Sequence, residues 1–334
     1  IGVTGDLVGL ALTQALNLSS SLQYGVRQSA DVVDQLTSVE RILEYSQLEP
    51  EIQPEVPQKV SSDWPSNGKI EFKQVFYRYS ADDEPVLRGL SFSVKPKEKI
   101  SVVGRTGAGK SSLISSIFRL AIVDGDILLD DVNTSSVDLK VLRSRISIIL
   151  QEPILFSGTL RRNLDPFEEF SDDDIWNALE NVELKEFISK HNGLQMPVLA
   201  HGQNFSTGQR QILCLARATL RKNRIIILDE ATANVDLRTD EMIQKTIREK
   251  FVDSTVITEA HRLNTVIDSD RVIVMDAGVA IEFDAPYLLM QNKNGVFRKM
   301  VKALGQQEYD HLHSRAKEKY ENFKNKKTSD GNLH

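Results

Sequence analysis

The stretch SVVGRTGAGKSSLISSIF, residues 101–118, decides the fold class of this chain. An apolar run leads into Gly104-x-x-x-x-Gly109-Lys110-Ser111, and a helical pattern follows it. A phosphate-binding loop requires this order of strand, loop and helix, because glycines let backbone N–H groups curve around phosphate oxygens and the helix N-terminus adds partial positive charge. A glycine-rich turn that binds nothing is the alternative, and the strand before it and the helix after it argue against that interpretation.

The loop gives individual side chains a role. Lys110 is expected to reach the β- and γ-phosphates of a nucleotide, and the Ser111 hydroxyl is expected to ligate Mg²⁺. The predicted nucleotide-binding residues of this loop are Gly104, Arg105, Thr106, Gly107, Ala108, Gly109, Lys110, Ser111 and Ser112.

A second apolar strand pattern ends in two carboxylates, in the stretch RIIILDE at residues 224–230. Ligands of open α/β sheets bind at the carboxyl ends of the strands. Asp229 is therefore expected to hold Mg²⁺ through water, and Glu230 to polarise the attacking water as a general base. An isolated Asp-Glu pair is common in solvated turns, but here a buried strand pattern precedes it and a phosphate loop lies upstream.

The region from Lys69 to Leu304 alternates short apolar runs with helical patterns. It begins with KIEFKQVFYRY, a strand pattern rich in aromatic and β-branched residues. Later runs such as ISVVG (100–104) and STVIT (254–258) are apolar throughout, as strands buried on both faces are. The fold class predicted for this region is α/β, with a parallel sheet covered by helices.

Composition excludes some classes of function. The chain has 334 residues, a net charge of −6 and a pI of about 5.6. A length of this order fits about two domains, and the acidic balance argues against nucleic acid as a partner. The single cysteine, Cys214, excludes an internal disulfide and indicates a reducing compartment; a small buried hydrophobe is the expected role of its side chain.

The flanks of the α/β region differ from it in composition. The first 26 residues carry one charge, Asp6, and polar residues interrupt them too often for a complete membrane span. They fit either the end of a membrane helix or an amphipathic helix of a soluble domain, and the helical pattern continues to Tyr45. Four prolines follow within residues 48–68, which predicts a linker. From Gly305 onward the chain is polar, typical of a frayed helix or disordered tail.

The order of motifs resembles the nucleotide-binding domain of ATP-binding-cassette (ABC) transporters, P-loop ATPases. NFSTGQRQ (204–211) stands between the phosphate loop and the Asp-Glu strand, and a histidine follows them. RRNLDPF (161–167) and DEATANVD (229–236) are most similar to the C subfamily, the multidrug-resistance-associated proteins, and within it to the second nucleotide-binding domain. The chain is then expected to be the carboxyl-terminal part of a longer transporter.

The resemblance implies four segments. Residues 1–48 would be the end of the last transmembrane helix and its cytoplasmic extension, 49–68 a linker, 69–304 the nucleotide-binding domain, and 305–334 a polar tail. The domain would contain a mostly parallel core sheet with helices, an antiparallel β subdomain and a helical subdomain.

The resemblance also implies roles for side chains outside the phosphate loop. Tyr79 matches the aromatic residue that stacks on adenine, although a tyrosine on an edge strand is an alternative. Gln151 matches the glutamine that contacts Mg²⁺ and the attacking water and senses the transmembrane domain. His261 matches the switch histidine that contacts the γ-phosphate. The implied catalytic residues are thus Glu230, His261 and Gln151, and the implied metal ligands are Ser111, Gln151 and Asp229.

Two further motifs would act across a dimer. In the family, two nucleotide-binding domains pack head to tail with two ATP molecules between them. The signature residues would face the γ-phosphate of ATP on the partner domain; they are Ser206, Thr207, Gly208 and Gln209. Asp236 matches the acidic end of a loop that crosses the dimer interface. By analogy, this signature completes the less active site of the pair, and the chain's own phosphate loop with Glu230 builds the more active one.

Four residues depart from the family pattern. Thr207 stands where glycine is common, and its side chain would lie where backbone approaches phosphate. Leu150 replaces a usual proline before Gln151, and Ala200 replaces a frequent glutamate. Glu259, in TVITEAHRL (255–263), stands in a strand where an apolar residue is usual. Residues two apart in a strand share a face, so Glu259 is expected to approach His261 if the strand extends that far. Glu259 is then expected to perturb the switch and to lower hydrolysis without abolishing it.

These observations favour an ATP-hydrolysing motor domain of an exporter of organic anions or xenobiotics. The expected cofactors are ATP and Mg²⁺. The expected partners are the first nucleotide-binding domain and the transmembrane domains of the same transporter, at the cytoplasmic face of a membrane such as the plasma membrane. One alternative is a regulatory module that binds ATP with weak hydrolysis, which Thr207 and Glu259 favour and Glu230 opposes. Another is a soluble ABC ATPase, which the C-subfamily motifs and residues 1–45 oppose.

Overall fold

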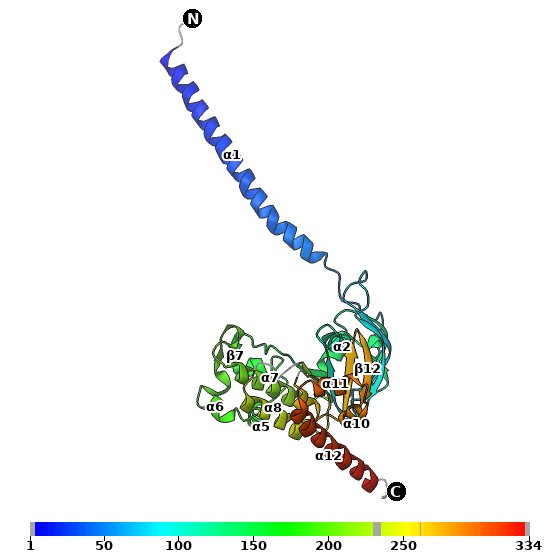
Figure 1. Cartoon of the computed structure of the whole chain (residues 1–334). Helices are drawn as coiled ribbons and strands as arrows, with labels where there is room; N and C mark the ends of the chain where they lie inside the picture. Colours follow the sequence, from blue (N-terminus) through cyan, green and yellow to red (C-terminus); the bar gives the residue numbers. More distant parts are fainter. Residues whose placement is uncertain (1–3, 230–234, 261, 331–334) are drawn as a thin grey trace. The chain divides into compact units, whose positions relative to one another are not determined.

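The computed structural model describes residues 4–229, 235–260 and 262–330, which divide into two compact units, residues 1–52 and 53–334. The first unit is one long helix, α1 (Gly5–Ser46), whose side chains are all exposed (Figure 1). The predicted helix is confirmed, and it ends shortly before Pro50 begins the proline-rich segment. In the described part of the chain, no helix is both long enough and apolar enough to cross a membrane. That residues 1–48 form the end of a transmembrane helix stays a prediction.

The second unit is built on a six-stranded sheet whose strand order is β12–β11–β3–β10–β9–β6. The strands are β3 (Lys99–Gly104), β6 (Ile146–Ile149), β9 (Ile225–Asp229), β10 (Thr255–Glu259), β11 (Arg271–Asp276) and β12 (Val279–Asp284). Neighbouring strands are parallel except for β12, which pairs antiparallel with β11. Helices cover the sheet, and the apolar runs are buried on both faces as predicted. The mostly parallel α/β fold is confirmed.

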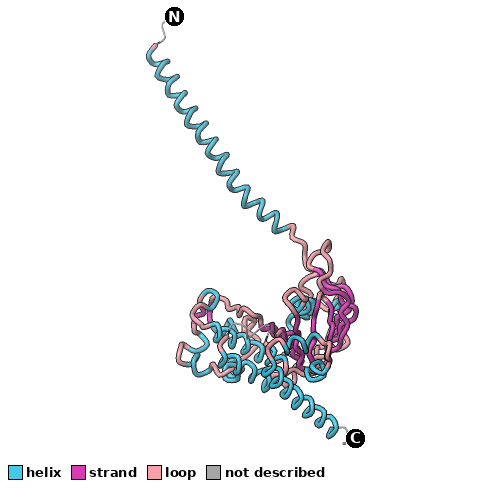
Figure 2. Tube along the Cα trace, in the orientation of Figure 1, coloured by secondary structure: helices cyan, strands magenta, loops and turns pink. Residues whose placement is uncertain are grey.

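An antiparallel sheet packs beside this core and has the order β2–β1–β4–β5. Its strands are β1 (Ile70–Arg78), β2 (Leu87–Val94), β4 (Ile122–Leu129) and β5 (Val132–Asn133), and the nearby helices are α2 (Lys110–Ile117) and α3 (Leu139–Ser144). Figure 2 shows the strands gathered toward one end of the unit. Phe72 and Phe92 stack in its core with ring centroids 4.4 Å apart. The predicted antiparallel subdomain is confirmed.

The expected linker differs from the structure at its carboxyl-terminal end. Trp64 is buried in the same core as the antiparallel sheet, and its Nε1 donates a hydrogen bond to the Leu129 carbonyl at 3.0 Å. The Asp130 carboxylate accepts hydrogen bonds from the backbone N–H groups of Asn67, Gly68 and Lys69. Composition predicted a linker because prolines and polar residues dominate the segment; the one large aromatic side chain anchors its end to the domain.

A helical subdomain holds the second core cluster, as predicted. Its helices are α4 (Leu160–Leu164), α5 (Asp172–Asn181), α6 (Lys185–Ser189) and α7 (Thr207–Arg221), with the short strands β7 (Gly158–Thr159) and β8 (Pro197–Val198) beside them. Helix α7 runs through this cluster because its apolar positions recur at helical spacing.

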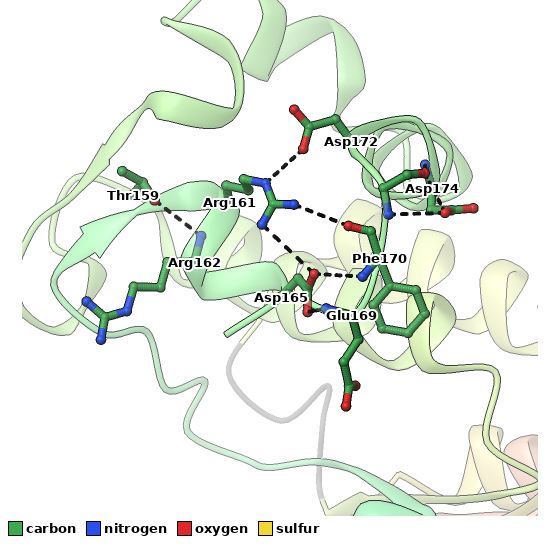
Figure 3. Close-up of polar contacts among 9 residues, drawn as sticks. Thr159, Arg161, Arg162, Asp165, Glu169, Phe170, Asp172 and Asp174 are labelled. Atoms are coloured by element: carbon green, nitrogen blue, oxygen red, sulfur yellow. Dashed lines mark hydrogen bonds and ion pairs between the residues drawn. The ribbon is translucent and has the colours of Figure 1, made fainter. Parts of the chain in front are cut away.

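Polar contacts fix the turn between α4 and α5 (Figure 3). Arg161 donates from Nε to Asp172 Oδ1 at 2.8 Å and from Nη2 to the Phe170 carbonyl at 3.2 Å. The Asp165 carboxylate accepts the backbone N–H groups of Glu169 and Phe170. The RRNLDPF motif therefore has a structural role, because it closes this turn.

The carboxyl-terminal helices form a third cluster against β11. They are α9 (Leu263–Val266), α10 (Pro286–Gln291), α11 (Val296–Lys302) and α12 (Gln306–Asp330). Helix α8 (Leu237–Lys250) precedes them in the chain and packs on the second cluster through Ile243. Tyr309, Leu312 and Ala316 of α12 are buried, and Arg315 pairs with Asp268 at 2.8 Å. The expectation of a frayed or disordered tail is therefore wrong for the first part of α12. Its sparse apolar residues lie on one face at spacings of three and four, which suffices to dock the helix.

Candidate nucleotide-binding site

The phosphate loop joins β3 to α2, as the sequence predicts. β3 ends at Gly104 and α2 begins at Lys110, so the loop lies at the carboxyl edge of the main sheet. Gly107 and Gly109 have φ angles of +80° and +98°, which favour glycine strongly. A Cβ at Gly104 would lie 2.5 Å from the Met275 carbonyl oxygen, so the pairing of β3 with β11 excludes a side chain there.

The side chains that follow the loop are held inward. Lys110 Nζ lies 3.3 Å from the Gly104 carbonyl and 3.5 Å from the Arg105 carbonyl. Its side chain is 6% exposed, so this ammonium is removed from solvent at the floor of the loop. Ser112 is buried as well, behind the start of α2. That Lys110 and Ser111 contact the phosphates and the metal ion stays a prediction.

Glu259 is the carboxylate that meets these two residues. Its Oε2 accepts a hydrogen bond from Ser111 Oγ at 3.0 Å, and its Oε1 lies 3.4 Å from Lys110 Nζ. The side chain is 3% exposed. Sequence reasoning expected Glu259 to approach His261, which lies outside the described residues. The carboxylate contacts the phosphate loop because the parallel register places Glu259 beside Val102 of β3.

Asp229 lies next to Glu259. Its register partner across the β9–β10 pair is Glu259, and both are the last residues of their strands. The oxygen set of Ser111, Asp229 and Glu259 has the chemistry that Mg²⁺ prefers, so the residues present fit a magnesium ion at this edge. The proposed base Glu230 lies outside the described residues.

Tyr79 lies at the rim of the same edge. Its hydroxyl lies 3.0 Å from Ser112 Oγ, and its ring packs edge-to-face on Tyr77. The side chain is 58% exposed, so a face of the ring is open to a planar ligand beside the phosphate loop. The position fits the predicted adenine stacking, which stays a prediction.

The loop after β6 carries Gln151, which is exposed. Gln211 of α7 donates from Nε2 to the Leu150 carbonyl at 3.0 Å, and Arg217 donates from Nη1 to the Ile154 carbonyl at 2.7 Å. Burial lowers the pKa of Arg217. Sequence reasoning missed both residues. The signal that was available is that both are polar residues within a stretch of α7 that is otherwise largely apolar.

The signature residues begin α7. Ser206 is the N-cap: its Oγ accepts the Gln209 backbone N–H at 3.1 Å, and Gln209 Oε1 accepts the Ser206 N–H at 2.9 Å. Thr207 Oγ1 accepts from Arg210 Nη2 at 3.1 Å. A Cβ at Gly208 would lie 3.0 Å from Thr239 Oγ1, so the glycine permits α7 to approach α8 closely. The signature is thus a capped helix N-terminus with an exposed Ser206.

Asp236 begins α8 in the same manner. Its carboxylate accepts the Thr239 backbone N–H at 3.1 Å and the Thr239 hydroxyl at 2.8 Å. This capping explains the residue type at position 236 without a partner domain. Its predicted place at a dimer interface stays a prediction.

Ala200, which stands where the family often has glutamate, lies exposed in a short 3₁₀ turn, residues Ala200–Gly202.

Comparison with known proteins decides the family. The sequence model of the family described as ABC transporter matches residues 87–233. Residues 87–233 therefore carry an ABC transporter domain. Over 94% of its length the chain is 53% identical to ATP-binding cassette sub-family C member 4 of Homo sapiens. Over 95% of its length it is 52% identical to the probable multidrug resistance-associated protein lethal(2)03659 of Drosophila melanogaster. The similarity to the C subfamily predicted from its motifs is confirmed.

The chain that carries this ABC transporter domain covers 24% of each of those relatives. It covers the same share of ABC transporter C family member 12 of Dictyostelium discoideum, to which it is 47% identical over 93% of its length. The chain therefore spans about a quarter of the length of the relatives it matches. The family match contains the phosphate loop, Gln151, the signature and Asp229. Tyr79, Asp236 and His261 lie outside that match.

Proposed function

We propose that this domain binds Mg²⁺-ATP at the carboxyl edge of the main sheet and hydrolyses it to drive export across a membrane. The observation that carries the proposal is the contact of Lys110 and Ser111 with Glu259, whose register partner at the end of the neighbouring parallel strand is Asp229. This arrangement joins an anion-binding loop to carboxylates in a site largely removed from water, as phosphoryl transfer requires.

Each residue is proposed to perform one step. Backbone N–H groups of the glycine loop and Lys110 orient the phosphates, and Tyr79 holds the base by stacking. Ser111, Gln151 and Asp229 hold Mg²⁺, which when bound offsets phosphate charge. Glu230 accepts a proton from the attacking water as general base, and His261 contacts the γ-phosphate.

A second nucleotide-binding domain is proposed to complete the site. Ser206 is exposed at the capped N-terminus of α7, where backbone N–H groups point outward. Such a helix end suits the γ-phosphate of ATP held by a partner. We propose that the partner is the first nucleotide-binding domain of the same transporter and that Asp236 lies at the interface between the two.

The transmembrane domains are proposed to dock near Gln151. This residue lines a cleft of about 510 Å³ together with Leu155, His201 and Arg210. Ile154 and Phe156 expose 50% and 69% of their side chains beside it. Exposed apolar side chains around a cleft fit a contact with another protein segment. The domain would then sit on the cytoplasmic face of a membrane, such as the plasma membrane, and the exported compounds would be organic anions or xenobiotics.

The test is ATP turnover of the chain mixed with the first nucleotide-binding domain of its transporter. Glu230→Gln is expected to abolish most turnover while leaving ATP binding intact, because only the base is lost. Glu241→Gln, the same chemical change at an exposed position on α8, is the matched control and should leave turnover unchanged. Turnover that survives Glu230→Gln would refute the motor function and favour a regulatory nucleotide-binding module.

A further inference from the structure

Glu259 places a negative charge among the groups that receive phosphate. Both of its carboxylate oxygens lie against residues of the phosphate loop, at 3.0 Å from Ser111 Oγ and 3.4 Å from Lys110 Nζ. Lys110 and Glu259 are 6% and 3% exposed, so water screens this pair weakly. Lys110 is therefore already charge-compensated before a nucleotide arrives.

The carboxylate cannot leave this edge of the sheet. β10 pairs on one side with β3 and on the other with β9, so the backbone of Glu259 is fixed between the phosphate loop strand and the Asp229 strand. A change of rotamer moves the carboxyl group by a few ångströms only. A nucleotide that uses Lys110 must therefore bind with this charge still nearby.

The repulsion that follows is large. A phosphate oxygen that accepts a hydrogen bond of about 2.9 Å from Lys110 Nζ would lie within about 6 Å of Glu259 Oε1. Two unit charges at about 6 Å, with an effective dielectric constant of about 20, change a dissociation constant by roughly a hundredfold. A divalent cation on the phosphates cancels much of this repulsion, because it removes two units of ligand charge at the point of contact.

We propose that Glu259 makes nucleotide binding by this domain depend on a divalent cation, because its buried carboxylate disfavours ATP that carries no metal. This inference rests on the proposed function, since it concerns the same phosphate site. Glu259 is then a residue that discriminates between the metal-bound and the metal-free nucleotide. A buried ion pair that only stabilises the fold would not discriminate between the two ligands.

The experiment compares the dissociation constants of a non-hydrolysable ATP analogue, measured by calorimetry on the full chain with EDTA and with saturating Mg²⁺ at equal ionic strength. The quantity of interest is the ratio of the two constants. Glu259→Gln and Glu259→Ile are expected to lower this ratio at least tenfold relative to the native chain, mainly through tighter binding in EDTA. Glu249→Gln, which removes an exposed carboxylate from α8, is the matched control and should leave the ratio unchanged.

The outcomes separate the inference from the proposed function. An equal ratio in the native chain and the Glu259→Gln variant overturns the inference. An equal decrease of the dissociation constants in EDTA and in Mg²⁺ overturns it as well, because Glu259 would then obstruct the ligand by its volume and not by its charge. If neither the native chain nor the variants bind the analogue in either condition, the proposed function itself is wrong. The glutamine variant preserves the shape of the side chain, and circular dichroism checks that it folds.

Discussion

The contact between Lys110 and Glu259 predicts that replacing Lys110, a residue of the phosphate loop, lowers the stability of the fold. Lys110→Met removes a cation whose Nζ lies 3.4 Å from Glu259 Oε1, with both side chains at least 94% buried. At this separation and an effective dielectric constant of about 20, the Coulomb attraction is about 5 kcal/mol. The net value of the pair is smaller, because burying both charges costs solvation. Removing one partner, however, leaves the other charge buried and uncompensated.

We therefore expect Lys110→Met to lower the free energy of unfolding by about 3–5 kcal/mol. Glu259→Gln together with Lys110→Met should recover most of this loss, since no buried charge remains. The assay is equilibrium urea unfolding of the native chain, the two single variants and the double variant at pH 7, without nucleotide. The double-mutant cycle isolates the coupling energy between the two side chains.

The pair Lys190–Glu186 is the matched control. Its atoms lie closer, at 2.7 Å, but the side chains are 68% and 83% exposed. The same cycle with Lys190→Met and Glu186→Gln should show a far smaller coupling, because solvent screens the pair. A coupling below about 1 kcal/mol for Lys110 and Glu259 would refute the reasoning, since a buried pair must exceed the usual exposed one.

Three further predictions concern the fold. Asp130→Ala should destabilise the domain by about 2–3 kcal/mol in urea unfolding, because it leaves three backbone N–H groups without an acceptor. Asp130→Asn should destabilise it less, because asparagine tolerates the φ of +47° and keeps one oxygen as an acceptor. Burial raises the pKa of the Cys214 thiol, so a disulfide reagent should modify it at pH 8 only as fast as the domain opens; rapid labelling in native buffer would contradict this. Burial lowers the pKa of Lys99 to about 8 from 10.5, so the unfolded chain binds more protons between these values and the free energy of unfolding rises with pH there. Lys99→Gln should remove this part of the pH dependence, and an unchanged pH profile would contradict the assignment.

Much of the fold could be predicted because its signals are local. The apolar run before Gly104, the glycines and the helical pattern after Lys110 each constrain their own backbone, and the structure places them as strand, loop and helix. The strand that ends at Asp229 was predictable for the same reason. The predicted nucleotide-binding loop thus needed no knowledge of distant residues.

Segments of mixed composition were harder to assign. The end of the expected linker joins the core through a single side chain, Trp64, and α12 docks through a few apolar residues in a polar stretch. Composition averages over such segments, whereas docking depends on which side chains meet a complementary surface. Gln211 and Arg217 stand out in the sequence as polar residues in an apolar stretch, but their partners, among them the carbonyls of Leu150 and Ile154, lie about 60 positions away and only the tertiary structure identifies them.

Glu259 shows which features follow from the sequence alone and which depend on the tertiary structure. The residues of TVITEAHRL predict a strand with a carboxylate at its end, and this much is a property of contiguous residues. The contact between that carboxylate and Ser111, 148 positions away, depends on β10 lying between β3 and β9 in a given register. A shift of register by one residue would turn the side chain to the opposite face of the sheet. The charge pattern was therefore visible in the chain, but strand order and register decided that it meets the phosphate loop.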